Sequence, residues 1–229
     1  MSRSILLTGF EPFGGERLNP SWEVAQRLDG RKFGGATVKA VRLPVHCARA
    51  AEAVTAAIAE LRPVAVLGLG QAAGRFGLSL EQVALNLADE RPVPEIESGL
   101  NGKPAVIDGP DAYFTRLPLK PIIEALRKRE VPAATSLSAG VYVCNTVMYA
   151  TLHALRRRPR LPAGFIHLPY ANGQATRRAA ASMSLDLMVI GIETALEVIA
   201  STDGVSAGTQ AREKRIRAGR EARNSADST

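Results

Sequence analysis

Short apolar segments alternate along this chain with segments of helical periodicity, and this alternation restricts the fold more than any other feature. The apolar segments 4–8 and 64–67 lack the polar alternation of a half-exposed strand, as strands of a parallel sheet do when both faces are covered. Between them, apolar side chains in 51–61 recur at helical spacing. We therefore expect an α/β fold: a single-domain α/β/α sandwich with a mostly parallel, mixed central sheet and helices on both faces.

The remaining elements continue the same alternation. Asn19 and Pro20 supply an N-cap and a first-turn proline for a helix that runs to about Leu28. Further strands are expected at 37–43, 79–87, 133–137 and 164–168, and further helices at 119–129, from Cys144 onward and at about 176–200. The proline-rich stretch 88–118 has neither pattern, and loops of this length are usually functional or form oligomer contacts.

The bulk composition is that of one soluble domain. The chain has 229 residues, of which 46% are hydrophobic and 22% charged, and this is ordinary for a globular protein with a sizeable core. Two cysteines cannot form a disulfide framework, and the first residues lack the longer apolar region of a signal peptide. No apolar run approaches the ~18 residues of a membrane span. We expect a cytoplasmic protein without membrane contact, in which Cys144 stays a free thiol.

The net charge of +7 raises the question of a nucleic-acid partner. Residues 201–229 contain six basic and four acidic residues and no apolar periodicity. We expect a folded domain at 1–200 followed by a disordered basic tail at 201–229. The sequence shows no interleaved aromatics, zinc-ligand spacing or recognition-helix pattern, so a solvated basic surface is favoured over a nucleic-acid site.

Cys144 occupies a position where cysteine becomes reactive. Small residues at 138–141 lead into a helical pattern at 144–153, which places this thiol at or next to a helix N-terminus. Unpaired backbone N–H groups and the helix dipole favour negative charge there, and the thiolate is the nucleophilic form of cysteine. A small buried hydrophobe is the alternative, and position alone leaves both possibilities open.

A reactive thiol needs a base, and the chain has three histidines. His153 lies nine residues along the same predicted helix, roughly 13 Å up its axis, and is interpreted as a packing residue. His46 adjoins Cys47, but neighbouring helical residues do not face each other. His167 ends the predicted strand 164–167. Because ligands of open parallel sheets bind at the carboxyl ends of strands, we expect Cys144 and His167 at one edge.

Glu81 is the candidate for orienting that base. It lies within the otherwise apolar extended segment 78–86, where a partly buried carboxylate requires a partner. A solvated strand face is the alternative. The segment 68–73 fits the glycine pattern of a dinucleotide site, but Gly74 and an extended segment follow it in place of a helix. We therefore expect neither a cofactor nor a metal.

Four segments together resemble the pyroglutamyl peptidase I family, also called pyrrolidone-carboxylate peptidases. Segment 7–15 (LTGFEPFGG), with Asn19-Pro20-Ser21, is similar to the opening loop of the family, and 70–86 (GQAAGRFGLSLEQVALN) to the segment of its catalytic Glu. Segments 136–145 (SLSAGVYVCN) and 164–169 (GFIHLP) resemble those of its catalytic Cys and His. The resemblance covers 4 to about 200, and departs from the family pattern at Gln82 and at 171–173.

This resemblance implies that Cys144 is the nucleophile, His167 the base and acid, and Glu81 the orienting carboxylate of a cysteine omega-peptidase. It implies substrates that are peptides with an N-terminal pyroglutamyl ring, and a homo-oligomer, either a dimer or a homotetramer. The expected substrate-binding residues are Phe10, Phe13, Gln71, Arg91, Tyr142 and Val143.

Two other classes of function stay open at this point. One is a phosphorylase-like or cofactor-binding α/β protein without peptidase activity, and the other is a nucleic-acid binder that uses the basic tail. Neither accounts for the combined placement of Cys144, His167 and Glu81.

Overall fold

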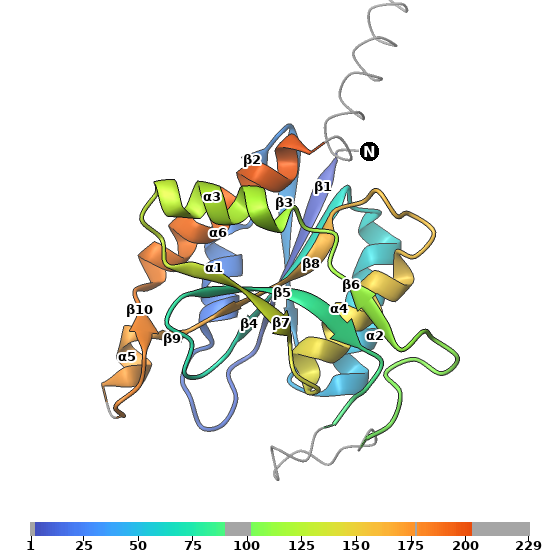
Figure 1. Ribbon diagram of the computed structural model, residues 1–229, viewed down its shortest axis with the longest axis horizontal. Helices are drawn as coiled ribbons and strands as arrows, with labels where there is room; N and C mark the ends of the chain where they lie inside the picture. The colour runs from blue at the N-terminus through green and yellow to red at the C-terminus, as the bar shows by residue number, and fades with distance from the viewer. Residues whose placement is uncertain (1–2, 90–101, 177, 203–229) are drawn as a thin grey trace, which may run out of the picture.

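A mixed central sheet organises the computed structural model, which describes residues 3–89, 102–176 and 178–202 (Figure 1). Within these ranges the sheet has eight strands. They are β1 (Ser4–Phe10), β2 (Lys32–Phe33), β3 (Ala36–Leu43), β4 (Ala65–Gln71), β5 (Leu78–Leu85), β6 (Ala112–Phe114), β7 (Ala133–Ser138) and β8 (Ala163–Leu168). Their order is β2-β3-β1-β4-β8-β5-β6, and β7 pairs with β5.

The pairing is mostly parallel, as the sequence predicted. Strands β3, β1, β4 and β8 run parallel to one another, and β7 runs parallel to β5. The antiparallel pairs are β2 with β3, β5 with β6, and β5 with β8. The reversal between β8 and β5 brings the start of β5 to the edge where β8 ends, since Ser79 is the register partner of His167.

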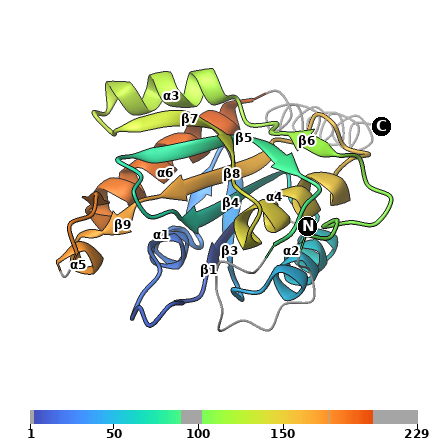
Figure 2. The same cartoon turned by 60° about the horizontal axis from the view of Figure 1, so that its bottom comes forward.

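Helices cover both faces of the sheet, which confirms the α/β/α sandwich. The helices are α1 (Pro20–Leu28), α2 (Cys47–Leu61), α3 (Leu119–Lys128), α4 (Val143–Ala154), the short α5 (Asn172–Ala175) and α6 (Leu185–Ser201). Figures 1 and 2 show α2 and α4 on one side of the sheet, with α1, α3 and α6 on the other. Each side buries its own apolar cluster against the strands.

Local capping explains where the first of these helices begins. Asn19 is the N-cap of α1, its side chain accepts a hydrogen bond from the Ser21 N–H at 3.1 Å, and Pro20 is the first helical residue. The sequence prediction for this helix is confirmed.

The start of the last helix was predicted wrongly. The helix α6 begins at Leu185, not near Thr176, because the Ser184 side chain caps it by accepting from the Leu187 N–H at 3.2 Å. The preceding residues form α5 and a two-stranded parallel pair, β9 (Tyr170–Ala171) with β10 (Ser182–Met183).

The glycine-rich segment after the third predicted strand does not open a helix. The strand β4 continues through Gly68 and Gly70 to Gln71, and the loop that follows leads into β5. None of the helices in the described ranges is long and apolar enough to cross a lipid bilayer.

Candidate active site

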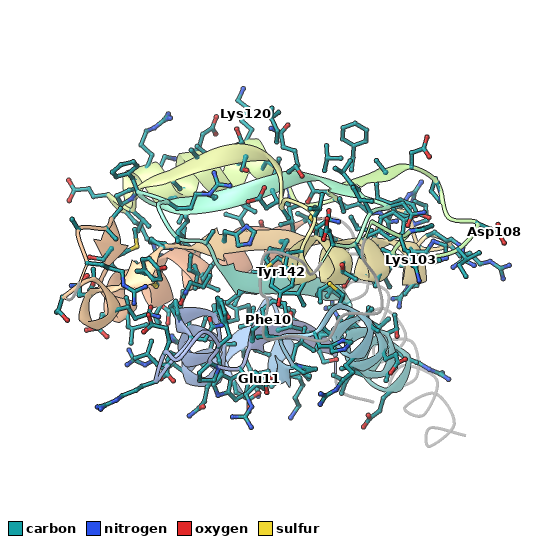
Figure 3. The ribbon with its side chains drawn as sticks, turned by 90° about the horizontal axis from the view of Figure 1, so that it is seen from below. Phe10, Glu11, Lys103, Asp108, Lys120 and Tyr142 are labelled. Atoms are coloured by element: carbon teal, nitrogen blue, oxygen red, sulfur yellow. The ribbon has the colours of Figure 1, made fainter. Side chains whose placement is uncertain are left out.

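Three neighbouring strands and one helix meet at the edge where the parallel strands end. His167 lies near the end of β8, where Gly70 of β4 is its register partner on one side and Ser79 of β5 on the other. The helix α4 packs against the same three strands, and its second residue is Cys144. Figure 3, seen from below the view of Figure 1, looks onto this edge.

Glu81 and His167 form a buried hydrogen-bonded pair. The distance from His167 Nδ1 to Glu81 Oε1 is 2.8 Å, and the exposed fraction is 0% for Glu81 and 4% for His167. The solvated-face alternative for Glu81 is therefore wrong. Because Nδ1 is engaged by the carboxylate, Nε2 is the ring nitrogen left to exchange a proton. The Phe165 ring packs edge-on against the imidazole, with 5.0 Å between ring centroids.

Cys144 is the second residue of α4, as the sequence predicted. Tyr142 is the N-cap, its side chain makes no capping hydrogen bond, and the first turn contains no acidic residue. No acidic side chain of this first turn therefore opposes a developing negative charge at the helix N-terminus.

Gly70 brings the thiol and the histidine to the same face of the sheet. A Cβ atom built on Gly70 would lie 2.8 Å from Cys144 Sγ and 2.8 Å from Cζ of Phe165. Phe165 precedes His167 by two residues in β8, so their side chains share one face. The thiol thus occupies space that a side chain at position 70 would fill, beside the strand that carries His167.

Burial raises the pKa of the Cys144 thiol. The negative charge of Glu81 and the neighbouring Cys47 raise this pKa further, while a backbone hydrogen bond opposes them. The predicted stabilisation of the thiolate by the helix terminus is therefore outweighed by burial. A thiol in this setting requires a base in order to react.

Asn145 ties the start of α4 to the end of β5. Its Oδ1 accepts from the Leu85 N–H at 2.8 Å, and its Nδ2 donates to the carbonyls of Leu85 and Leu87 at 2.9 and 2.8 Å. This side chain is fully buried and uses three hydrogen bonds to hold Cys144 relative to the strand of Glu81. Sequence reasoning missed this role, although a polar residue in an otherwise apolar helix start was a signal for it.

The histidine of α4 has a structural position. His153 Nδ1 lies 3.0 Å from the Tyr113 hydroxyl, and the imidazole stacks on Tyr149. The interpretation of His153 as a packing residue is confirmed.

The expected substrate-binding residues differ in exposure. Phe10 is 2% exposed and packs on Phe165 with 6.4 Å between ring centroids, whereas Phe13 and Tyr142 are partly exposed and pack against the same apolar cluster. Figure 3 shows Phe10 and Tyr142 near the centre of the face that looks along the strand ends. Val143, the first residue of α4, is buried at 3% exposure.

Two further candidates complete the predicted set. Gln71 ends β4, and its Oε1 accepts a hydrogen bond from Gln174 Nε2 at 3.0 Å. Arg91 lies outside the described residues. Within the described ranges, no group of three or more His, Cys, Asp or Glu side chains is arranged to hold a metal ion.

Comparison with known proteins identifies the family. A sequence model of pyroglutamyl peptidase matches residues 3–202, which is most of the chain. The chain belongs to the pyroglutamyl peptidase family.

Relatives and solved structures agree with this family. The chain is 42% identical over 198 residues to pyrrolidone-carboxylate peptidases of Yersinia pestis and Yersinia pseudotuberculosis, covering 86% of this chain and 92% of each relative. Pyroglutamyl peptidase I of Bacillus amyloliquefaciens superposes with a TM-score of 0.83 at 36% identity, covering 88% of this chain and 98% of that one. A mutant pyrrolidone carboxyl peptidase of the hyperthermophile Pyrococcus furiosus superposes with a TM-score of 0.81 at 38% identity, covering 86% and 97%.

The two departures from the family pattern lie beside the candidate triad in sequence but outside it in space. The backbone carbonyl of Gln82 accepts from the Thr115 N–H at 2.8 Å, just after the end of β6. Residues 171–173 end β9 and begin α5, where the Ala171 N–H donates to Gln174 Oε1 at 3.0 Å. Neither departure replaces a contact between Glu81 and His167.

Proposed function

We propose that this member of the pyroglutamyl peptidase family is a cysteine omega-peptidase that removes N-terminal pyroglutamate from peptides. The observation that supports this most directly is the buried hydrogen bond between Glu81 and His167, at the sheet edge where α4 presents Cys144. Three side chains of complementary chemistry, from β5, β8 and α4, converge there in a chain of this family.

In the first half of the reaction, Cys144 attacks the exocyclic carbonyl carbon of the pyroglutamyl residue. His167 takes the thiol proton as the carbon–sulfur bond forms, and Glu81 stabilises the resulting imidazolium. The Cys144 N–H, in the first turn of α4, donates to the oxyanion of the tetrahedral intermediate. His167 then gives its proton to the departing amine as the carbon–nitrogen bond breaks, which leaves a thioacyl enzyme.

The second half of the reaction regenerates the thiol. His167 accepts a proton from water, and the water oxygen attacks the thioacyl carbonyl carbon. Collapse of this second intermediate breaks the carbon–sulfur bond, His167 returns the proton to sulfur, and pyroglutamate leaves. The raised pKa of Cys144 makes His167 essential to both halves, because little thiolate forms without a base.

Recognition of the neutral lactam ring is assigned to residues around the thiol. We infer that Phe10, Phe13, Tyr142 and Val143 provide apolar walls for the ring methylenes, while Gln71 and Arg91 provide polar contacts. An ordinary N-terminal ammonium would lose its hydration among these walls without a counter-charge, at a cost on the order of several kcal/mol.

The decisive test compares two fluorogenic amides of matched size. Pyroglutamyl amide and prolyl amide share the five-membered ring, but only the first has the lactam carbonyl and lacks the ammonium. We expect hydrolysis of the pyroglutamyl amide at least about a hundredfold faster, in line with discrimination by a site built for a polar group. Equal rates on both amides, or hydrolysis of neither, would contradict the proposal.

The proposal extends to the assembly, location and partners of the protein. We propose a cytoplasmic homo-oligomer, a dimer or a homotetramer, that acts on peptides and binds neither nucleic acid nor membranes. Gel filtration with light scattering measures the assembly. We also propose that residues 1–200 carry the activity, so a chain ending at Thr202, just after α6, should keep its folding and its turnover.

A further inference from the structure

Arg75 reaches the buried carboxylate from the loop between β4 and β5. One of its guanidinium nitrogens lies 3.8 Å from Glu81 Oε1, the same oxygen that accepts from His167. The same nitrogen lies 3.4 Å from the Ser136 hydroxyl of β7. The Arg75 side chain is 40% exposed and Glu81 is 0% exposed, so the cation spans from solvent to the interior of the site.

The loop that carries Arg75 is held in place by its neighbours. Gly74 adopts a left-handed conformation with φ of +77°, which turns the chain immediately before Arg75. Gly77 packs against Pro132, where an added Cβ would lie 2.4 Å from the Pro132 carbonyl oxygen, and the Leu78 N–H donates to that oxygen at 2.9 Å. The turn is thus anchored at its β5 end, whereas Gly74 and Phe76, on either side of Arg75, are exposed.

The carboxylate of Glu81 has few other partners. Its Oε1 accepts from His167, and its buried Oε2 makes no hydrogen bond to the part of the chain that the structure describes. A buried carboxylate is costly unless it is paired or hydrogen-bonded. Arg75 is the cation paired with it among the described residues, since His167 is charged only when it is protonated.

Charge at Glu81 also acts on the nucleophile. The groups that face one another here are Arg75 of the β4–β5 loop, Glu81 of β5, His167 of β8, Cys144 of α4 and Cys47 of α2. The negative charge of Glu81 raises the pKa of the Cys144 thiol. A cation beside Glu81 offsets part of that effect at the sulfur, although its exposure and solvent screening reduce the magnitude.

We propose that Arg75 is a positioning residue that holds the Glu81 carboxylate oriented toward His167 and offsets its negative charge at the Cys144 thiol. The inference rests on the proposed function for the roles of Glu81, His167 and Cys144. It adds to Glu81, His167 and Cys144 a fourth side chain, which is partly exposed to solvent.

The test uses Arg75→Gln and Arg75→Lys, with Arg129→Gln as the matched control. Arg129 forms an exposed ion pair with Glu197 at 2.9 Å, between α3 and α6 and away from the strand ends. For Arg75→Gln we expect kcat to fall about tenfold with a smaller change in KM. The pH profile should move to higher pH, because the Cys144 thiol loses its proton less readily when the cation beside Glu81 is absent. Arg75→Lys should keep kcat and the pH profile close to those of the wild type. Arg129→Gln should leave both quantities unchanged.

A second readout does not depend on peptidase activity. The rate of Cys144 alkylation by iodoacetamide is measured by peptide mapping at a series of pH values. In Arg75→Gln, the curve of this rate against pH should shift to higher pH by on the order of half a pH unit. An unchanged alkylation profile in a folded Arg75→Gln protein would overturn the proposal. Failure of the wild-type chain to hydrolyse pyroglutamyl amide would instead reject the proposed function, and the alkylation result would still decide the effect of Arg75 on the thiol.

A double-mutant cycle tests whether Arg75 acts through Glu81. If it does, Arg75→Gln should reduce kcat much less in a Glu81→Gln background than in the wild type. Equal losses in the two backgrounds would contradict the proposed route. If Arg75→Gln does not fold, Ser136→Ala removes the other contact of the guanidinium and should shift the same two profiles in the same direction, by less.

Discussion

His167 Nδ1 lies 2.8 Å from Glu81 Oε1, in a pair that β8 and β5 bring together although 86 residues separate them in sequence. The contact depends on the reversal of β5 relative to β8, which places residues near the start of one strand beside the end of the other. Because the Glu81 carboxylate accepts a hydrogen bond from Nδ1–H, it favours the imidazole tautomer in which Nε2 carries no proton. That Nε2 can then take a proton from a thiol.

Replacing Glu81 by Gln should therefore impair the chemical step. The amide is nearly isosteric, but it cannot stabilise an imidazolium and can favour the wrong tautomer. We expect kcat to fall by about tenfold to a thousandfold, with a smaller change in KM, because the nucleophile and the oxyanion donor remain. Steady-state kinetics of a variant with wild-type circular dichroism measures this. A folded Glu81→Gln protein with wild-type kcat would remove Glu81 from the mechanism.

The two cysteines should respond oppositely to substitution. Cys144→Ala should reduce pyroglutamyl-amide hydrolysis by at least about a thousandfold, because no other group at the strand ends can form the thioacyl intermediate. Cys47→Ala should keep most of the activity, since Cys47 is fully buried at the start of α2. Mass mapping after iodoacetamide treatment gives an independent measurement. Inactivation that follows alkylation of Cys47 while Cys144 stays intact would contradict the assignment.

Local signals made much of the fold predictable. The cap at Asn19 and the proline at position 20 act within a few residues of each other, so the start of α1 could be predicted from sequence. The start of α6 depends on a competition that is not local. Residues 176–184 are compatible with a helix, but pairing between β9 and β10 holds the chain in another conformation until Ser184 caps the helix.

The same distinction applies to the candidate site. The edge shared by Cys144 and His167 follows from the strand order, which the alternation of strands and helices indicates. The support given by Asn145 comes from contacts across 58 to 60 residues, for which the sequence carries no periodic signal. Arg75 is close to Glu81 in sequence, but the turn that brings its guanidinium to the carboxylate carries no periodic signal either. The pKa of the Cys144 thiol also depends on tertiary burial, which raises it, and a position at a helix N-terminus carries no signal of that burial.

His153 should make the stability of the fold dependent on pH. Burial and then Arg156 lower the pKa of His153 in the folded protein, whereas an unfolded histidine titrates at about 6.5. As pH falls below about 6.5, the unfolded chain binds a proton at this position before the folded chain does, so the free energy of unfolding decreases. His153→Gln can keep the hydrogen bond to Tyr113 and should lose less melting temperature between pH 7.5 and 5.5 than the wild type. Parallel melting curves for the two proteins would contradict this contribution.

Gly70 should be intolerant of even one added carbon, for a reason that belongs to the site. An alanine Cβ at this position would lie 2.8 Å from Cys144 Sγ and 2.8 Å from Phe165 Cζ, closer than non-bonded carbon contacts allow. Because small displacements of a reacting atom reduce the rate strongly, we expect Gly70→Ala to lower kcat/KM about a hundredfold. Gly68→Ala is the matched control, since the three atoms nearest to its Cβ, from 2.4 Å outward, all belong to the Phe165 ring. Both variants should melt at a lower temperature than the wild type, but only Gly70→Ala should lose most of its activity per folded molecule at a temperature where both remain folded. Equal losses per folded molecule would show that displacement of Phe165, not of the thiol, limits the reaction.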